Sequence, residues 1–183
     1  LRIRRQQALS QQHIASQIIR LHVIANSDET ADQTLKKEVK DQVVTYLRSK
    51  MNQAASIQAA RQVICQEMDA LKEIAEKKIR QEGYDYPVTV SLGTTYFPVK
   101  EYGDMAFPAG DYEALRVQIG KSKGRNWWCV MYPSLCLVDG VYQTVPENSK
   151  DKLKQVLSTS EYQSLVDGGE DVQFRLRFFD WLF

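Results

Sequence analysis

The residues best equipped for chemistry in this chain are three cysteines and two histidines. Cys129 and Cys136 lie seven positions apart, whereas Cys65 has no cysteine near it in the sequence. A cysteine hydrolase needs a thiolate beside an imidazole, and the imidazoles available are His13 and His22. His22 lies within an apolar run, where it can pair with Cys129 or serve as a structural histidine. No spacing among these residues matches a zinc site, so no metal and no cofactor are expected.

The three cysteines leave two interpretations open. One bridge between Cys129 and Cys136 would close the loop 130–135 and leave Cys65 over. Closing a loop of this length stabilises the folded state by about 2.5 kcal/mol in the chain-entropy model. Alternatively, all three cysteines remain thiols, which pack as small hydrophobic side chains.

Two adjacent tryptophans immediately precede Cys129. In a strand, Trp127 and Trp128 point to opposite faces, so at most one can belong to the core of a sheet that is covered on one side. Tyrosines surround them in the sequence, Tyr132 among them. Exposed Trp and Tyr dominate binding hot spots, so a partner interface and a two-layer core are both open interpretations.

The charge balance excludes one class of partner. The charges of the 24 basic and 23 acidic residues nearly cancel. The chain therefore has no net positive field that would attract nucleic acid. No apolar run approaches the roughly 20 residues that span a bilayer, so a soluble chain is expected. Residues 1–17 are polar and basic at their start, and we expect them to form an N-terminal extension without an export leader.

The elements that must position these residues begin with a strand and two helices. The aliphatic run 18–25 predicts a strand that is buried on both faces. Apolar residues at helical spacing predict helices over 35–51 and 57–79, the second ended by Gly83. Thr30 and Gln33 match a capping box for the first helix.

In the second half of the chain, apolar and polar residues alternate in several stretches, which is typical of strands. Strands are predicted over 88–92, 114–119 and 127–132, the last two as antiparallel neighbours joined by the turn 120–124. Residues 103–110 are expected to be a loop. Short helices are predicted around 153–157 and 162–166, with a capping box at Ser160 and Gln163, and a final strand over 172–178.

This order of elements predicts the α+β class. We expect a single domain over 18–183, in which a mostly antiparallel sheet packs against two long N-terminal helices. Short C-terminal helices and a final strand complete it.

Many short stretches, all in one order, resemble the stage II sporulation protein R family. They are IRLHVIANSD at 19–28, DQ at 32–33, LK at 35–36, VKD at 39–41, GYDY at 83–86, LG at 92–93, FP at 97–98, PAGDYEAL at 108–115, IG at 119–120, NWWCV at 126–130 and LC at 135–136. The resemblance is strong over residues 18–138 and weak in the tail.

The resemblance implies a protein that is secreted from the forespore into the space between the forespore and mother-cell membranes. There such a protein activates a membrane-embedded aspartic protease, which processes the precursor of sigma-E. An exported setting also favours the bridge between Cys129 and Cys136, because disulfides persist in oxidising compartments.

Our first hypothesis is therefore a protease activator without catalytic activity of its own. Its expected contact residues are Trp127, Trp128, Asn126, Tyr132, Arg20, His22, Asn26 and Asp28. The alternative is an extracytoplasmic cell-wall hydrolase that uses Cys129 or a carboxylate with His22. A scaffold that binds cell-wall glycans through exposed aromatics is a third hypothesis.

Overall fold

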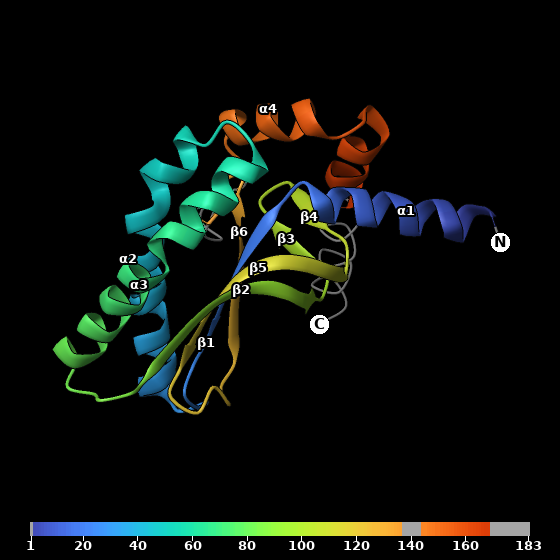
Figure 1. Cartoon of the computed structure of the whole chain (residues 1–183). Helices are drawn as coiled ribbons and strands as arrows, with labels where there is room; N and C mark the ends of the chain where they lie inside the picture. The colour runs from blue at the N-terminus through green and yellow to red at the C-terminus, as the bar shows by residue number, and fades with distance from the viewer. Residues whose placement is uncertain (1, 137–143, 169–183) are drawn as a thin grey trace. The chain divides into compact units, whose positions relative to one another are not determined.

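A computed structural model describes residues 2–136 and 144–168 of the chain (Figure 1). The chain divides into two compact units, which are described separately. Unit 1 comprises Leu1–Gln17, Tyr96–Tyr112 and Leu137–Phe183, and unit 2 comprises Ile18–Thr95 and Glu113–Cys136. Helices and a mixed sheet make this an α+β protein, as predicted. The domain boundary expected at residue 18 stays a prediction.

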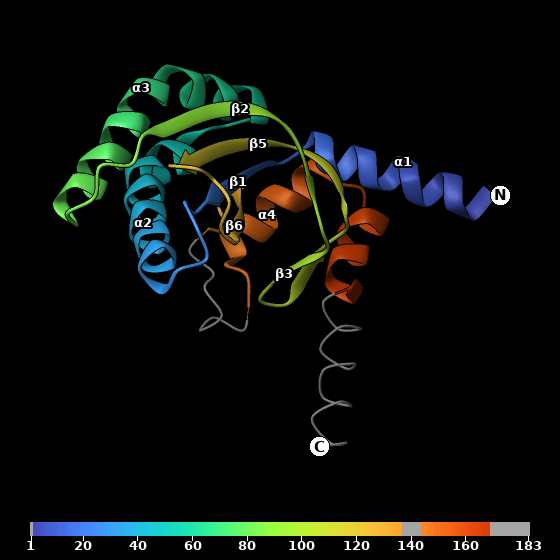
Figure 2. The same cartoon turned by 90° about the horizontal axis from the view of Figure 1, so that it is seen from below.

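The centre of unit 2 is a four-stranded sheet in the order β2-β5-β1-β6 (Figures 1 and 2). Its strands are β1 (Ile19–Ile24), β2 (Val88–Phe97), β5 (Gly110–Ile119) and β6 (Asn126–Tyr132). β1 runs parallel to β5 and antiparallel to β6. Every residue of β1 is buried, as expected for an aliphatic strand with a neighbour on each side.

The expectation that 114–119 and 127–132 are adjacent strands is wrong, because β1 lies between them. The two strands run in opposite directions, since each pairs with β1, one parallel and one antiparallel. The connection 120–125 therefore crosses two strand spacings, about 10 Å, over the end of β1. Hairpin rules consider neighbours in sequence and cannot detect a strand inserted from elsewhere in the chain.

Two long helices, α2 (Thr30–Gln53) and α3 (Ile57–Gln81), lie side by side next to the sheet (Figures 1 and 2). α2 packs on α3, β1 and β6, which buries the apolar stripe that predicted it. The Ser56 hydroxyl accepts a hydrogen bond from Ala59 N and caps α3. Gly83, with a φ of 83°, ends α3 as predicted. Its N–H and that of Tyr84 donate to Arg80 and Ile79, the pattern of a Schellman motif.

The capping box expected at Thr30 and Gln33 is absent from the start of α2. The residue before the helix is Glu29, whose side chain makes no capping hydrogen bond. Instead, the Gln33 amide donates to the Ser27 carbonyl at 2.9 Å. α2 thus begins at Thr30, one residue earlier than the capping box requires. The bond from Gln33 links the first turn of the helix to Ser27 in the preceding loop.

Unit 1 contains α1 (Arg2–Ser16), a two-stranded sheet of β3 (Lys100–Tyr102) and β4 (Met105–Phe107), α4 (Glu147–Val156) and a helical stretch over 159–168. The loop expected over 103–110 thus contains a short strand. The turn between β3 and β4 is tied to α4 and to the chain before it, because Asp104 accepts hydrogen bonds from Val145 N and Lys150 Nζ, each at 2.7 Å. The strand predicted over 172–178 lies outside the described residues.

The short helices predicted in the tail exist, but the second begins with a different cap. Ser158 N donates to Glu161 Oε2 at 2.9 Å, and Glu161 N donates back to Ser158 Oγ at 3.3 Å. This reciprocal pair is a capping box, two residues before the expected pair of Ser160 and Gln163. Both Ser158 with Glu161 and Ser160 with Gln163 have the spacing of a capping box. The pair with Glu161 forms, because a carboxylate is a stronger hydrogen-bond acceptor than an amide.

Candidate interaction site at one end of the sheet

Most of the expected contact residues converge where three strands meet. The carboxyl ends of β1 and β5 lie at the same edge of the sheet, because the two strands are parallel, and β6 begins there because it is antiparallel. Ile24 of β1 pairs with Asn126 of β6 and with Gln118 of β5. The region formed by residues 22–28, 116–125 and 126–128 is called the sheet end below.

The connection between β5 and β6 is fastened to the residues that follow β1. The Asn26 side chain accepts a hydrogen bond from Lys121 N at 2.9 Å, and the Asn26 carbonyl accepts one from Lys123 N at 3.2 Å. Gly124 N donates to Ala25 O at 3.0 Å, and Arg125 N donates to Asp28 Oδ1 at 2.6 Å. Asn26 and Asp28 therefore act first as anchors for this loop.

Asp32, in the first turn of α2, organises the turn that carries Asn26. Its carboxylate accepts hydrogen bonds from Asn26 Nδ2 at 2.8 Å and from Ser27 Oγ at 2.6 Å. Burial acts to raise the pKa of Asp32, but hydrogen bonds from Ser27, Asn26 and Tyr86 outweigh it, and the pKa is lowered. The carboxylate is thus ionised at neutral pH and holds the turn against the helix.

Trp127 faces α2. Its register partner is Val23, and Lys40 Nζ lies 4.5 Å from the centre of its ring. Lys40 is 5% exposed and forms an ion pair with Asp41 at 2.5 Å. One turn earlier, Lys36 donates to the Arg125 carbonyl at 2.9 Å and to Gln33 at 2.6 Å. Two buried lysines of one helix face thus hold the start of β6, and a cation over an indole face stabilises both partners.

Trp128 faces the other side of the sheet, as the alternation predicts. Its register partner is His22, and the two ring centroids are 5.8 Å apart with a tilt of 36°. Burial lowers the pKa of His22, a hydrogen bond with Asn126 acts to raise it, and the charge of Arg116 lowers it further; the net direction is down. His22 is therefore neutral at pH 7. Both tryptophans are half-buried, and the indole nitrogen of each is shielded from solvent.

Two of the expected contact residues lie away from the sheet end. Tyr132 pairs with Ile19, at the opposite end of β1 and β6, and is 4% exposed. Arg20 lies two residues before His22 on the same face and is fully buried. The structure therefore brings together Trp127, Trp128, Asn126, His22, Asn26 and Asp28, and leaves Tyr132 and Arg20 in the interior.

Cys129 and Cys136 form a disulfide, with a Cα–Cα distance of 5.0 Å. This disulfide contradicts the hypothesis of a hydrolase with Cys129 as its nucleophile, because a sulfur in a disulfide cannot act as a thiolate. Cys65 is a free thiol on the exposed side of α3.

Among residues 2–136 and 144–168, no group of three or more His, Cys, Asp or Glu side chains is placed to hold a metal ion. Within the same residues, no helix is long and apolar enough to cross a membrane.

Sequence reasoning missed Lys36, Lys40 and Gly124 as parts of this site. The two lysines are four residues apart on α2, each one position after a member of the apolar stripe, which places them next to its buried side. Gly124 has a steric role, because a Cβ there would overlap the Ser27 carbonyl. No sequence signal identifies that contact, since it joins segments almost a hundred residues apart.

The fold and the sheet end define a disulfide-bridged α+β protein whose candidate site is built around two half-buried tryptophans. Comparison with known sequences gives the family. The family model described as Stage II sporulation protein R matches residues 15–142, which include the whole sheet end and the disulfide. The chain therefore belongs to the stage II sporulation protein R family.

A curated relative agrees with this assignment. Stage II sporulation protein R of Bacillus subtilis (strain 168) is 37% identical over 139 residues, which cover 76% of this chain and 62% of that relative. The chain thus spans less than two thirds of the relative's length. No solved structure matches the chain.

Proposed function

We propose that this chain is an extracytoplasmic signalling protein of sporulation that activates a membrane-embedded aspartic protease. The protease then processes the sigma-E precursor, which couples gene expression in the mother cell to the forespore. The chain would act in the space between the two membranes. Membership in the stage II sporulation protein R family supports this role. The disulfide suits an oxidising compartment outside the cytoplasm.

The observation that carries the proposal is the pair of adjacent, half-buried tryptophans at the sheet end. Lys40 lies over the ring of Trp127, and the ring of Trp128 lies next to that of His22 at a tilt of 36°. A pair of aromatic side chains that is already ordered loses little entropy on binding, and Trp is the commonest hot-spot residue. The sheet end is therefore the surface we assign to the protease, and binding there would favour the protease's active state.

Replacing Trp128 tests this assignment. In a reconstituted assay of sigma-E precursor processing, Trp128→Ala should raise the half-maximal concentration of the activator about thirtyfold, the effect of losing a hot spot worth about 2 kcal/mol. Tyr96→Ala is the matched control, because Tyr96 is an aromatic residue of β2 that is 63% exposed and lies outside the sheet end.

Circular dichroism and urea unfolding must show that both variants keep the fold. Equal activity of Trp128→Ala and the wild-type chain would remove the sheet end from the interface. If Trp128→Ala instead weakens binding to purified peptidoglycan and leaves processing unchanged, the glycan-binding function replaces the one proposed.

A further inference from the structure

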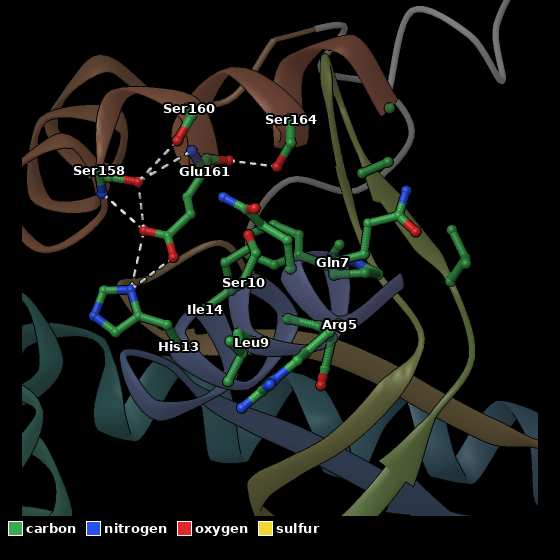
Figure 3. Close-up of a pocket in the computed structure, with 17 residues that line it drawn as sticks. Arg5, Gln7, Leu9, Ser10, His13, Ile14, Ser158, Ser160, Glu161 and Ser164 are labelled. Carbon is green, nitrogen blue, oxygen red and sulfur yellow. Dashed lines mark hydrogen bonds and ion pairs between the residues drawn. The ribbon is translucent and has the colours of Figure 1, made fainter. Parts of the chain in front are cut away.

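Unit 1 contains a large groove that the family match does not explain. α1, the β3–β4 hairpin with its flanks, and the helical stretch at 158–168 enclose about 1210 Å³ (Figure 3). Pockets for small molecules measure about 300–1,000 Å³, so this groove has the size for a peptide segment. Residues 5–14 and 158–168 lie outside the matched residues 15–142. The groove is thus formed largely by the parts of the chain beyond the family match.

The surface of the groove is mainly apolar, although polar side chains such as Ser160 and Ser164 also line it, and it is incompletely covered. Leu9 of α1 and Val99 before β3 both line it and are 56% and 54% exposed, although both are large apolar side chains. Phe107 and Ala106 of β4 add buried apolar surface to the lining. Gln11 also lines the groove, and its side-chain nitrogen is buried without a hydrogen-bond acceptor among residues 2–136 and 144–168. An apolar segment would cover the exposed side chains of Leu9 and Val99.

A hydrogen bond joins two walls of the groove. His13 Nδ1 of α1 lies 2.9 Å from Glu161 Oε1 (Figure 3). Glu161 also accepts hydrogen bonds from Ser158 N at 2.9 Å and Ser158 Oγ at 2.8 Å. Burial acts to raise the pKa of Glu161, and the bonds from Ser158 and His13 outweigh it and lower it. This contact joins α1 to the start of the helical stretch at 159–168.

We propose that the groove is the docking site of the chain's own C-terminal segment, residues 169–183. Gly168, the residue immediately before this segment, itself lines the groove. The segment alternates apolar and polar residues from Val172 to Phe178 and then ends in the apolar run FDWLF at 179–183. An extended strand with this alternation presents Phe174, Leu176 and Phe178 to one side and its two arginines to the other.

The reach of the segment fits the groove. Fifteen extended residues span up to about 50 Å, whereas residues 5–14 of α1 rise over about 15 Å. A segment that starts at Gly168 is therefore long enough to run along the whole of α1 that lines the groove. The segment would cover Leu9 and Val99 and fasten α1 to the helical stretch at 159–168. This inference concerns unit 1 and is independent of the function proposed for the sheet end.

Hydrogen exchange on the full-length chain tests the docking. The triple variant F174S/L176S/F178S removes the apolar side of the segment, and Q173S/R175S/R177S is the matched control, because it changes the other side. Exchange of the amides of residues 5–14 should become about tenfold faster or more in the first variant, as expected when a docked segment is released. The control should remain within about twofold of the wild-type chain. Equal exchange in the two variants overturns the proposal.

A photo-crosslinking experiment keeps the proposal testable if the apolar triple variant fails to fold. A photoreactive phenylalanine analogue replaces Leu9, or Gln12 as the control, which is exposed and does not line the groove. The crosslink from position 9 should map to residues 169–183 of the same molecule, and position 12 should give no such product. A crosslink from position 9 that joins two chains would instead assign the groove to a second copy and overturn docking within one chain.

Discussion

Gly124→Ala should destabilise the protein, because the loop that crosses the end of β1 has no room for a methyl group. A Cβ at position 124 would overlap the Ser27 carbonyl oxygen and lie 2.5 Å from its carbon and 2.9 Å from Ala25 Cβ. The contacts are with backbone and with a methyl group that cannot rotate away. The loop must therefore move off the end of β1.

The size of the effect follows from the hydrogen bonds that the movement breaks. Gly124 N to Ala25 O, Lys123 N to Asn26 O and Arg125 N to Asp28 Oδ1 all join this loop to the residues after β1. At about 1 kcal/mol each, their loss lowers the free energy of unfolding by about 3 kcal/mol. With an m-value of about 2 kcal/mol/M, the urea midpoint falls by about 1.5 M.

Gly93→Ala is the matched control for this substitution. Gly93 lies in β2, and a Cβ there meets nothing within 4 Å. Replacing a strand glycine with alanine at an unstrained position stabilises a protein by about 0.5 kcal/mol, so the two variants should shift the urea midpoint in opposite directions. Midpoints for Gly124→Ala and Gly93→Ala that agree within 0.2 M, at equal m-values, would refute the assigned role of the loop.

Three further expectations concern the disulfide, the buried histidine and the helix cap. Replacing Cys129 and Cys136 with serine should lower the free energy of unfolding by about 2.5 kcal/mol, measured by urea titration; an unchanged midpoint contradicts this. His22 has a lowered pKa in the folded chain, so the unfolded chain binds more protons just below pH 6.5, and stability should fall as pH decreases through that window. His22→Gln should flatten this dependence in thermal melts at pH 7 and 5, and equal slopes would exclude His22 as its source. Ser158→Ala should destabilise the protein by about 1 kcal/mol and Ser160→Ala by less than half of that, and the reverse order in urea unfolding would restore the cap predicted at Ser160.

The features that could be predicted from the sequence are the ones with a local signal. The aliphatic run 19–24 predicts a buried strand, and helical spacing predicts α2 and α3 with the stop at Gly83. Alternation alone places Trp127 and Trp128 on opposite faces. In each case, neighbours within a few positions determine the outcome.

The features that could not be predicted depend on contacts between distant segments. The insertion of β1 between β5 and β6 leaves no mark in the turn that joins those strands. The burial of Lys36 and Lys40 depends on a carbonyl and an indole that lie about ninety residues away in sequence. For the candidate site, the sequence identified most of its members, but it could not show that Arg20 and Tyr132 lie in the interior.

The central place of β1 also determines an order of events while the chain is being made. α2 and α3 are neighbours in sequence and can pair as soon as both have emerged. β1 emerges before them, yet its register partners Leu115 and Cys129 follow Leu21 by roughly a hundred residues. A chain interrupted before β5 therefore carries an apolar strand with both edges open, the kind of segment that aggregates. The stretch from β1 through β6 is the smallest part of the chain in which this strand has both of its neighbours.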